Sequence, residues 1–254
     1  MNLKVITLNT WFNKFLDKQV DFIKKEDPDV LLLQEVTSGL DSKNDSGPTN
    51  GYQQLIQSLP GYFYAYTPMW HLSLANNTYD LGLAIFSKAP LLETHSIYYY
   101  KEMQFISKFT GGQDFPGVYL SGKISVAGQI IEIISTHFIW SLFPEINHFQ
   151  KEAIPIFKKH LAGKQNFILG GDFNVTDDSE IYQELVSIVK DDRPKGTKRT
   201  LHPQLHKVGT AKELAVDYLF HKGSAIQLLS SQVPVVPLSD HLPIVATYNI
   251  QENL

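Results

Sequence analysis

The chain has 254 residues, of which 43% are hydrophobic, 12% aromatic and 19% charged, a composition typical of a globular protein and not of a disordered or fibrous one. Its 22 Lys and Arg against 26 Asp and Glu give a net charge of −4, so any site for a polyanion must be local. The absence of cysteine excludes disulfide scaffolds, cysteine zinc sites and thiol catalysis. No apolar run approaches the roughly 20 residues of a membrane-spanning helix, and the N-terminus is not typical of a leader peptide. We therefore expect a cytoplasmic protein, with a secreted one still open if a leader has been removed.

The first half of the chain alternates strand and helix signals. Apolar, β-branched runs predict strands over residues 4–8, 29–35, 62–67, 81–87 and 97–100, and a hairpin of 119–126 with 130–136. Leu16, Val20 and Ile23 recur at helical spacing between the first two strands. Residues 30–33 are four consecutive aliphatics without alternation, which predicts a strand covered on both faces. Residues 41–51, rich in Ser, Asn, Asp and Gly, predict a surface loop.

The second half continues in the same layered α/β pattern. Apolar residues three or four apart predict an amphipathic helix over 146–160, broken or kinked near Pro155. A second helix is predicted over 180–189, followed by a polar loop over 191–212. The remaining strands are predicted over 166–169, 216–220, 233–236 and 244–250.

Several predicted strands end in a polar side chain. The candidate functional residues are Asn9, Glu35, His137, Asp172, Asn174, Asp217, Asp240 and His241. Strand ends are where α/β folds build sites, because the strand holds the backbone while its last side chain leaves the core. Each residue also has a structural explanation, as a cap, an Asx turn or a hydrogen-bonded histidine, but all of these explanations would have to hold together.

Three of the candidates carry a stronger physical signal. Glu35 follows four aliphatic residues, where a buried carboxylate is costly unless it reaches solvent or a cation. Asp172 and Asn174 follow paired glycines that allow a close backbone approach, and the strand alternation aims both side chains the same way. Asp217, within an apolar strand, is typical of a carboxylate that orients a base.

The ordered set of motifs resembles the endonuclease/exonuclease/phosphatase superfamily, which has the deoxyribonuclease I fold. The motifs are Leu8-Asn9-Thr10-Trp11, Leu33-Gln34-Glu35-Val36, Gly82-Leu83-Ala84-Ile85-Phe86-Ser87-Lys88, Ser135-Thr136-His137, Gly170-Gly171-Asp172-Phe173-Asn174, Val216-Asp217-Tyr218 and Ser239-Asp240-His241. The resemblance implies one α/β catalytic domain over residues 1–254, built as a four-layer αββα sandwich of two mixed sheets flanked by helices. It also implies hydrolysis of phosphate esters with Mg²⁺ or Mn²⁺.

The resemblance implies a cation site made of oxygen ligands. Mg²⁺ takes one or two carboxylates and keeps several waters, which suits Glu35 with Asn9 or Asp240 nearby. Glu35 is the first ligand that we expect.

The resemblance also assigns roles to the remaining candidates. Asp172 would orient or deprotonate the attacking water, while Asn174 and His137 would hold the phosphate oxygens. His241 would act as base or charge stabiliser, with Asp217 setting its tautomer. The base is thus either Asp172 or His241, and this choice stays open.

One feature departs from the family pattern. In deoxyribonuclease I a glutamate before the middle strand pairs with the histidine that corresponds to His137. The nearest acid in this chain is Asp80, which is offset by about one residue. Asp80 is therefore the candidate for that partner, and because of the offset the resemblance does not assign general-acid work to His137.

The family cleaves several classes of phosphoester with one core, so only residues in the loops can indicate the substrate. The only two arginines, Arg193 and Arg199, fall in one loop and predict a phosphate-backbone contact, unless that loop is simply solvated; His202, His206 and Lys207 extend its positive character if the histidines are protonated. Trp140 and Trp70 lie in apolar segments that either stack bases, meet a lipid interface or pack in the core.

Three functions follow from these alternatives. The arginine loop favours a nuclease or related phosphodiesterase acting on nucleic acid, as a monomer. A phospholipid, sphingomyelin or small-molecule (inositol-type) phosphoesterase of the same fold is the second interpretation. A catalytically dead interaction module is the third, and it is disfavoured because every candidate residue is present.

Overall fold

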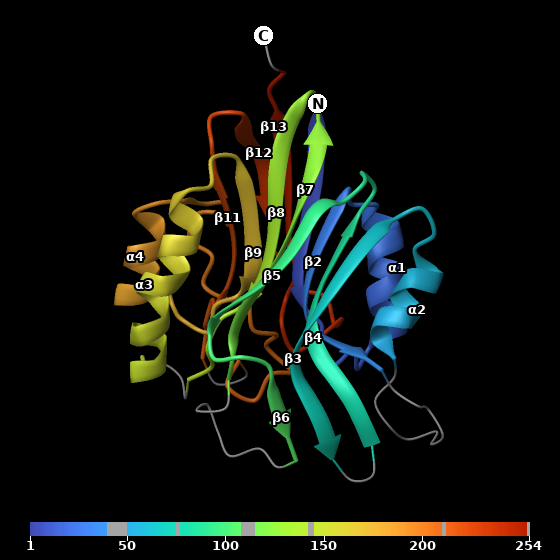
Figure 1. The fold of residues 1–254 in the computed structure, drawn as a ribbon, viewed down its shortest axis with the longest axis vertical. Helices are drawn as coiled ribbons and strands as arrows, with labels where there is room; N and C mark the ends of the chain where they lie inside the picture. The colour runs from blue at the N-terminus through green and yellow to red at the C-terminus, as the bar shows by residue number, and fades with distance from the viewer. Residues whose placement is uncertain (40–49, 75–76, 108–114, 142–144, 210–211, 253–254) are drawn as a thin grey trace.

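Two β-sheets packed face to face form the centre of the molecule (Figure 1). The computed structural model describes residues 1–39, 50–74, 77–107, 115–141, 145–209 and 212–252. The first sheet has the strand order β12 (Ile226–Gln232), β13 (Ile244–Ile250), β1 (Asn2–Asn9), β2 (Val30–Ser38), β4 (Asn77–Ser87), β3 (Phe63–Leu74) and β6 (Gln104–Ile106). The second sheet has the order β10 (Lys190–Asp191), β11 (Asp217–Lys222), β9 (Phe167–Asp172), β8 (Gln129–His137), β7 (Gly117–Val126) and β5 (Leu92–Tyr100). Both sheets contain parallel and antiparallel pairs.

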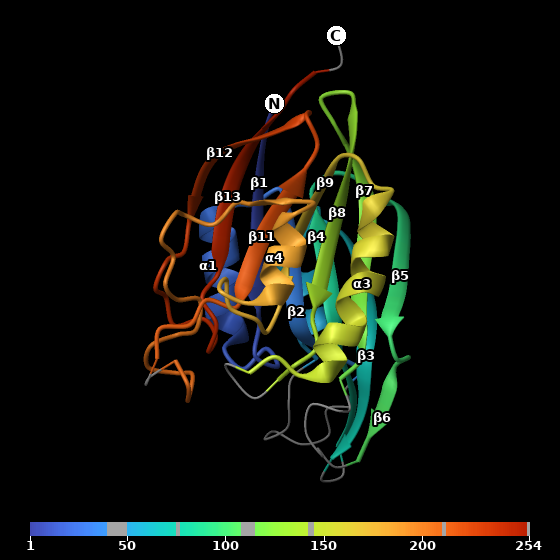
Figure 2. The same ribbon diagram turned by 90° about the vertical axis from the view of Figure 1, so that its left-hand side faces the viewer.

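Helices cover the outer face of each sheet. The first sheet packs on α1 (Leu16–Glu26) and α2 (Gly51–Ser58), and the second on α3 (His148–Ala162) and α4 (Glu180–Val186). Figure 2 shows α3 and α4 lying in front of β8, β9 and β11, with α1 on the far side of the sandwich. The arrangement is the predicted four-layer αββα sandwich.

The strand β2 lies between β1 and β4, and its side chains alternate between two apolar cores, which explains its run of four aliphatic residues. Val30 and Leu32 point into the core between the two sheets, while Leu31 and Leu33 point into the core beneath α1 and α2. All four side chains are fully buried. A run of aliphatic residues without polar alternation is thus what a strand with two covered faces requires.

The C-terminal strands differ from the prediction. A strand over 233–236 is wrong, because these residues have no regular structure and the pairing with β13 ends at Gln232. Pro234 and Pro237 cannot donate to a strand ladder, and Val235 is 63% exposed. The strand β12, which is mostly polar, comes earlier and was not predicted.

Some smaller elements also escaped prediction. Residues 41–49 of the predicted loop lie outside the described residues, and Gly51 begins α2, whose first turn is capped by the side chain of Asn50. The short strands β6 and β10 were not predicted either. The helix α3 continues through Pro155 without a break.

The topology brings six strand ends to one end of the sandwich, opposite the N-terminus (Figure 1). β1 and β2 run parallel in one sheet, and β8 and β9 run parallel in the other. β13 is antiparallel to β1, and β11 is antiparallel to β9, so both begin where their neighbours finish. The polar residues at these strand ends therefore meet across the two sheets.

Candidate active site

Strand register aligns the residues of the second sheet. His137, the last residue of β8, pairs with Asp172, the last residue of β9. Asp172 pairs in turn with Asp217, the first residue of β11. Three functional groups thus stand side by side on three adjacent strands because their backbones are locked by the ladder.

A local irregularity in β2 turns Glu35 out of the core. The register against β4 shifts between Leu33 and Val36, and Glu35 has a left-handed backbone with φ of 54°. Such a conformation is uncommon for a residue other than glycine, and a bulge of this kind re-aims a side chain. The bulge explains how a strand that is otherwise buried presents one carboxylate at the sheet end.

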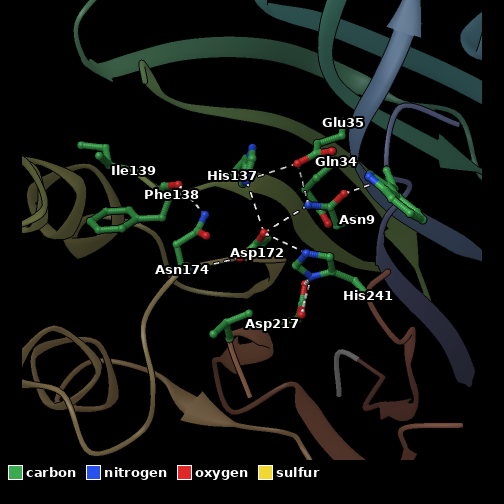
Figure 3. Close-up of polar contacts among 12 residues, drawn as sticks. Asn9, Gln34, Glu35, His137, Phe138, Ile139, Asp172, Asn174, Asp217 and His241 are labelled. Atoms are coloured by element: carbon green, nitrogen blue, oxygen red, sulfur yellow. Dashed lines mark hydrogen bonds and ion pairs between the residues drawn. The ribbon is translucent and has the colours of Figure 1, made fainter. Parts of the chain in front are cut away.

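Asp172 lies at the centre of the polar network in Figure 3. Its Oδ2 accepts a hydrogen bond of 3.1 Å from Asn9 Nδ2 and lies 3.3 Å from His137 Nε2 and 3.8 Å from His241 Nε2. Its Oδ1 accepts the backbone N–H of Asn174 at 2.9 Å. Burial alone would raise the pKa of Asp172, but the charge of His241 and the hydrogen bonds from His137 and Asn174 lower it to about 2. Asp172 is therefore a fixed, ionised acceptor.

Glu35 lies beside this network, and its negative charge is less fully balanced by neighbouring groups than that of Asp172. Asn9 Nδ2 donates to its Oε1 at 3.1 Å, and His137 Nε2 is 4.0 Å from the same oxygen. Burial raises the pKa of Glu35, and the negative charge of Asp240 raises it further, while the two nearby histidines and Asn9 lower it. The net pKa of Glu35 is raised, so its charge is not fully balanced by the protein.

His241 and Asp217 form a buried dyad. His241 Nδ1 lies 2.9 Å and 3.1 Å from the two carboxylate oxygens of Asp217, which leaves Nε2 directed at Asp172. Thr200 Oγ1 accepts the backbone N–H of Asp217 at 3.0 Å and holds the strand start in place. Burial lowers the pKa of His241, but the carboxylates of Asp217 and Asp172 outweigh burial and raise it well above its usual value.

Asn174 and His137 complete the network. Asn174 has a positive φ of 53°, and its Nδ2 donates to the carbonyl oxygen of Phe138 at 3.1 Å. Burial lowers the pKa of His137, but the hydrogen bond and charge of Asp172 outweigh it and raise the net pKa. Nδ1 of His137 is buried and has no hydrogen-bond partner among the described residues.

A cavity of about 220 Å³ opens onto this network. Its polar wall consists of Glu35, His137, Asp172, Asn174, His206, Asp240 and His241. Its apolar wall consists of Trp11, Phe12, Trp70, Phe115 and Trp140. The rings of Phe115 and Trp140 stack with centroids 6.0 Å apart, and Trp70 meets Phe115 edge-on at 4.4 Å. Within the described ranges, no Lys or Arg lines the cavity.

Comparison with known proteins places this arrangement in a family. Residues 6–241 match the model of the Endonuclease/Exonuclease/phosphatase family. The chain belongs to this family. No curated protein matches the sequence.

Several solved structures share the fold at low sequence identity. An endonuclease/exonuclease/phosphatase from Bacteroides vulgatus is 18% identical with a TM-score of 0.75, and the match covers 99% of this chain and 100% of that one. The human Nocturnin catalytic domain with bound sulfate anion is 19% identical with a TM-score of 0.67, covering 98% and 95% of the two chains. The mannosyl-6-phosphatase Bt3783 from Bacteroides thetaiotaomicron is 17% identical with a TM-score of 0.68, covering 97% and 99%. Membership of the family supports a phosphoester hydrolase.

The core candidates from the sequence are brought together by this family fold. Asn9, Glu35, His137, Asp172, Asn174, Asp217, Asp240 and His241 all contact the network or line the cavity. Trp140 lines the cavity and is half-buried, whereas Trp70 packs in the core between the sheets, 2% exposed, and only borders the cavity. Residues 142–144 of the apolar segment after His137 lie outside the described residues.

Among the described helices, none has the length and apolar character needed to span a membrane.

The two arginines of the predicted substrate loop do not line the cavity. The Arg193 side chain is only 4% exposed, since its guanidinium binds Asp191 through two nitrogens and lies 3.8 Å from the centre of the Tyr218 ring. Arg199 donates to the carbonyl oxygen of Gly209 and lies 3.5 Å from Glu213. The predicted substrate contact by Arg193 is therefore corrected, because its guanidinium has a structural role. Arg199 does not line the cavity either.

The expected partner of His137 is also corrected. Asp80 lies 2.7 Å from His71 Nδ1 on the neighbouring strand β3 and not beside His137. Asp172 and Glu35 are instead the acids that face His137.

Sequence reasoning missed three of the residues that line the cavity, namely Trp11, Phe12 and Phe115, and it named His206 only for the positive character of the arginine loop. Trp11 and Phe12 follow Asn9 directly and have positive φ values of 50° and 56°, so the turn after β1 projects them toward the site. Their position next to a candidate strand end was the available signal.

Proposed function

We propose that the chain is a divalent-cation-dependent hydrolase of phosphate diesters, acting on a small organic ester whose non-reacting group enters the aromatic cavity. One observation carries the proposal. Three carboxylates, Glu35, Asp172 and Asp240, line a cavity in which the described residues place no Lys or Arg. Carboxylates that converge without a Lys or Arg are suited to a bound metal ion, and phosphoryl transfer requires positive charge near the phosphoryl oxygens.

The donor set fits a hard cation such as Mg²⁺ or Mn²⁺. Glu35 is half-buried, its charge is incompletely balanced by the protein, and the charge of Asp240 raises its pKa. Mg²⁺ commonly uses one or two carboxylates and retains waters, which fits Glu35 and Asp240. When bound, the cation supplies charge that polarises the phosphoryl group and lowers the pKa of a bound water.

Asn9 has a positioning role in this scheme. Its Nδ2 donates to both Glu35 and Asp172, and its Oδ1 accepts the backbone N–H of Trp11 at 3.0 Å. The reversed amide would place Oδ1 against two carboxylates, which is repulsive, so this orientation is set by chemistry. Asn9 therefore holds the two acids at a fixed separation.

The protein groups around Asp172 determine how the reaction proceeds. Asp172 is held by Asn9 and by the backbone of Asn174, so it orients an attacking water through the carboxylate oxygen that faces the cavity. His241, held by Asp217, directs Nε2 at the same region and stabilises negative charge that develops on the phosphoryl group. His137 lies on the opposite side of Asp172 and contributes a second positive edge.

The cavity favours a small ester over a long polyanion. The prediction of a nucleic-acid substrate depended on a phosphate contact by Arg193, but this side chain is buried and paired with Asp191. Binding of a nucleic-acid backbone depends on Lys and Arg at successive phosphates, whereas the walls here are aromatic. The half-buried rings of Trp11, Phe115 and Trp140 are instead suited to pack against an apolar or planar organic group.

The test measures hydrolysis of bis(4-nitrophenyl) phosphate and of 4-nitrophenyl phosphate in Mg²⁺ or Mn²⁺, with EDTA and Asp172→Asn as controls. We expect turnover of the diester that is lost in EDTA and falls by at least about 100-fold in Asp172→Asn. A folded protein that binds Mn²⁺ and hydrolyses neither ester contradicts the proposal.

A parallel assay decides between the two substrate classes. Nicking of supercoiled plasmid is measured at about 50 and about 200 mM salt. Nicking that is faster than diester turnover and falls steeply with salt would assign the enzyme to nucleic acid, whereas a salt-insensitive turnover of small esters supports the aromatic cavity as the binding site.

A further inference from the structure

The loop between β10 and β11 supplies one side chain to the cavity that no strand end provides. We propose that His206 is a neutral hydrogen-bond donor that contacts a phosphoryl oxygen of the substrate through Nε2–H. This inference rests on the proposed function, since it assigns a further substrate contact in the same cavity. His206 lies beside Asp240 and His241 in the cavity wall, and its ring is perpendicular to that of His241 with centroids 5.7 Å apart.

The backbone of the loop sets the tautomer of His206. Its Nδ1 accepts the N–H of Val208 at 3.2 Å and the N–H of Gly209 at 3.1 Å. A ring nitrogen that accepts two N–H groups must carry the lone pair, so the proton of the neutral imidazole is on Nε2. Protonating Nδ1 would direct its N–H at two other N–H groups, which this loop disfavours.

The same tautomer argues against a metal-ligand role. A ring nitrogen of His206, a carboxylate oxygen of Asp240 and a ring nitrogen of His241 lie within 4.8 Å of one another, a spacing that a metal ion could bridge. A metal ligand needs a lone pair, and the lone pair of His206 is directed at the loop backbone. The nitrogen left for the cavity is Nε2, which carries a proton and donates.

A donor at this position has chemical value in this cavity. The phosphoryl group brings negative charge to a wall that already holds three carboxylates, and the described residues around it include no Lys or Arg. A preorganised N–H aimed at the phosphoryl oxygens therefore offsets charge without the cost of reorientation during the reaction. For Nε2 of His206, no hydrogen-bond partner is found in the described part of the chain, which leaves this donor for the substrate.

The chain offers a matched control in the same loop. His202 Nδ1 likewise accepts a backbone N–H, from Gln204 at 3.1 Å, but His202 does not line the cavity. Substitution of His202 therefore tests the loop-stabilising role alone.

Two substitutions separate the two nitrogens of His206. In His206→Asn the amide oxygen can replace Nδ1 as the acceptor of the loop N–H groups, while the reach of Nε2–H is lost. In His206→Gln the amide nitrogen replaces the Nε2–H donor, while the loop acceptor is lost. We expect kcat/KM to fall by about 10- to 150-fold in His206→Asn, to stay within about 5-fold in His206→Gln, and to be unchanged in His202→Asn.

Three readouts decide the inference independently of turnover. Affinity for inorganic phosphate in Mg²⁺, measured by calorimetry, should fall in His206→Asn but not in His202→Asn. Affinity for Mn²⁺ should be unchanged in both, and ¹⁵N NMR of the imidazole should place the proton on Nε2. A loss of Mn²⁺ affinity in His206→Asn would make His206 a metal ligand and overturn the inference, as would equal losses of activity and melting temperature in all three variants. If the wild-type protein hydrolyses no ester, the proposed function fails, while phosphate affinity still tests the donor.

Discussion

The dyad of His241 and Asp217 gives the sharpest test of how the site functions. Asp217→Asn keeps the size of the side chain and removes its charge. The two residues are 7% and 3% exposed, and Nδ1 of His241 lies 2.9 Å from the nearer carboxylate oxygen, so water cannot replace the lost interaction. We expect kcat to fall while KM changes little, because Asp217 contacts His241 and not the cavity.

The expected magnitude follows from the type of hydrogen bond. A hydrogen bond to a charged group contributes about 1.5 to 3 kcal/mol, whereas a neutral one contributes about 0.5 to 1.5 kcal/mol. If the amide of the Asp217→Asn variant accepts from Nδ1–H through its oxygen, the difference of about 1 to 1.5 kcal/mol corresponds to a loss of about 5- to 12-fold in kcat. If that amide presents its NH₂ instead, His241 takes the other tautomer and the loss grows toward about 10⁴-fold. The prediction is therefore a fall of at least about 5-fold.

The assay compares kcat and KM on an ester that the wild-type enzyme hydrolyses, together with the melting temperature. Asp192→Asn is the matched control, because Asp192 also lies 2.6 Å from a histidine, His221, in a buried pair outside the cavity. We expect Asp192→Asn to alter stability and to leave kcat unchanged. A kcat for Asp217→Asn within about 3-fold of wild type, or an equal loss in both variants, would refute the reasoning.

The remaining predictions concern the cation and the core. Glu35→Gln should weaken Mn²⁺ binding by at least about 10-fold, measured by electron paramagnetic resonance, while leaving the fold intact by circular dichroism. Asp192→Ala should lower the free energy of unfolding by about 3 kcal/mol, because it leaves His221 Nδ1 and the Tyr248 hydroxyl without their common acceptor. Tyr248→Phe removes one of these donors and should cost about 1 kcal/mol, measured by urea unfolding; equal costs for the two variants would contradict the assignment.

Elements with a strong apolar pattern could be predicted from the sequence. Residues 30–33 predicted a doubly covered strand, and 244–250 predicted β13 with the observed bounds, since both bury most of their side chains. The polar strand β12 could not be predicted in this way, because it lies at a sheet edge and is held by backbone pairing with β13. Its stability depends on a partner that is distant in the sequence, and a local pattern carries no information about it.

The strand-end interpretation brought out most of the polar network for a physical reason. When two strands pair in register, residues that end them are adjacent whatever their separation in sequence, as His137, Asp172 and Asp217 are. The loop contacts had no such constraint. The sequence predicts a phosphate contact by Arg193, but the carboxylate of Asp191, two residues earlier, binds its guanidinium instead.

The contrast between Asp217 and His206 shows why substrate identity is harder to predict than reaction class. Asp217 occupies a strand position whose place beside Asp172 is set by the sheet topology, so an acidic residue there is a signal that the sequence can show. The role proposed for His206 depends on a loop whose own amide groups set the tautomer of its ring, and this depends on the backbone path of Val208 and Gly209. The sequence shows that a histidine is present, but it does not show which ring nitrogen accepts the hydrogen bonds of the loop backbone. The residues proposed for catalysis thus lie at strand ends, where the sequence pattern indicates them, whereas the residues proposed to contact the substrate depend on loop geometry that only the folded chain defines.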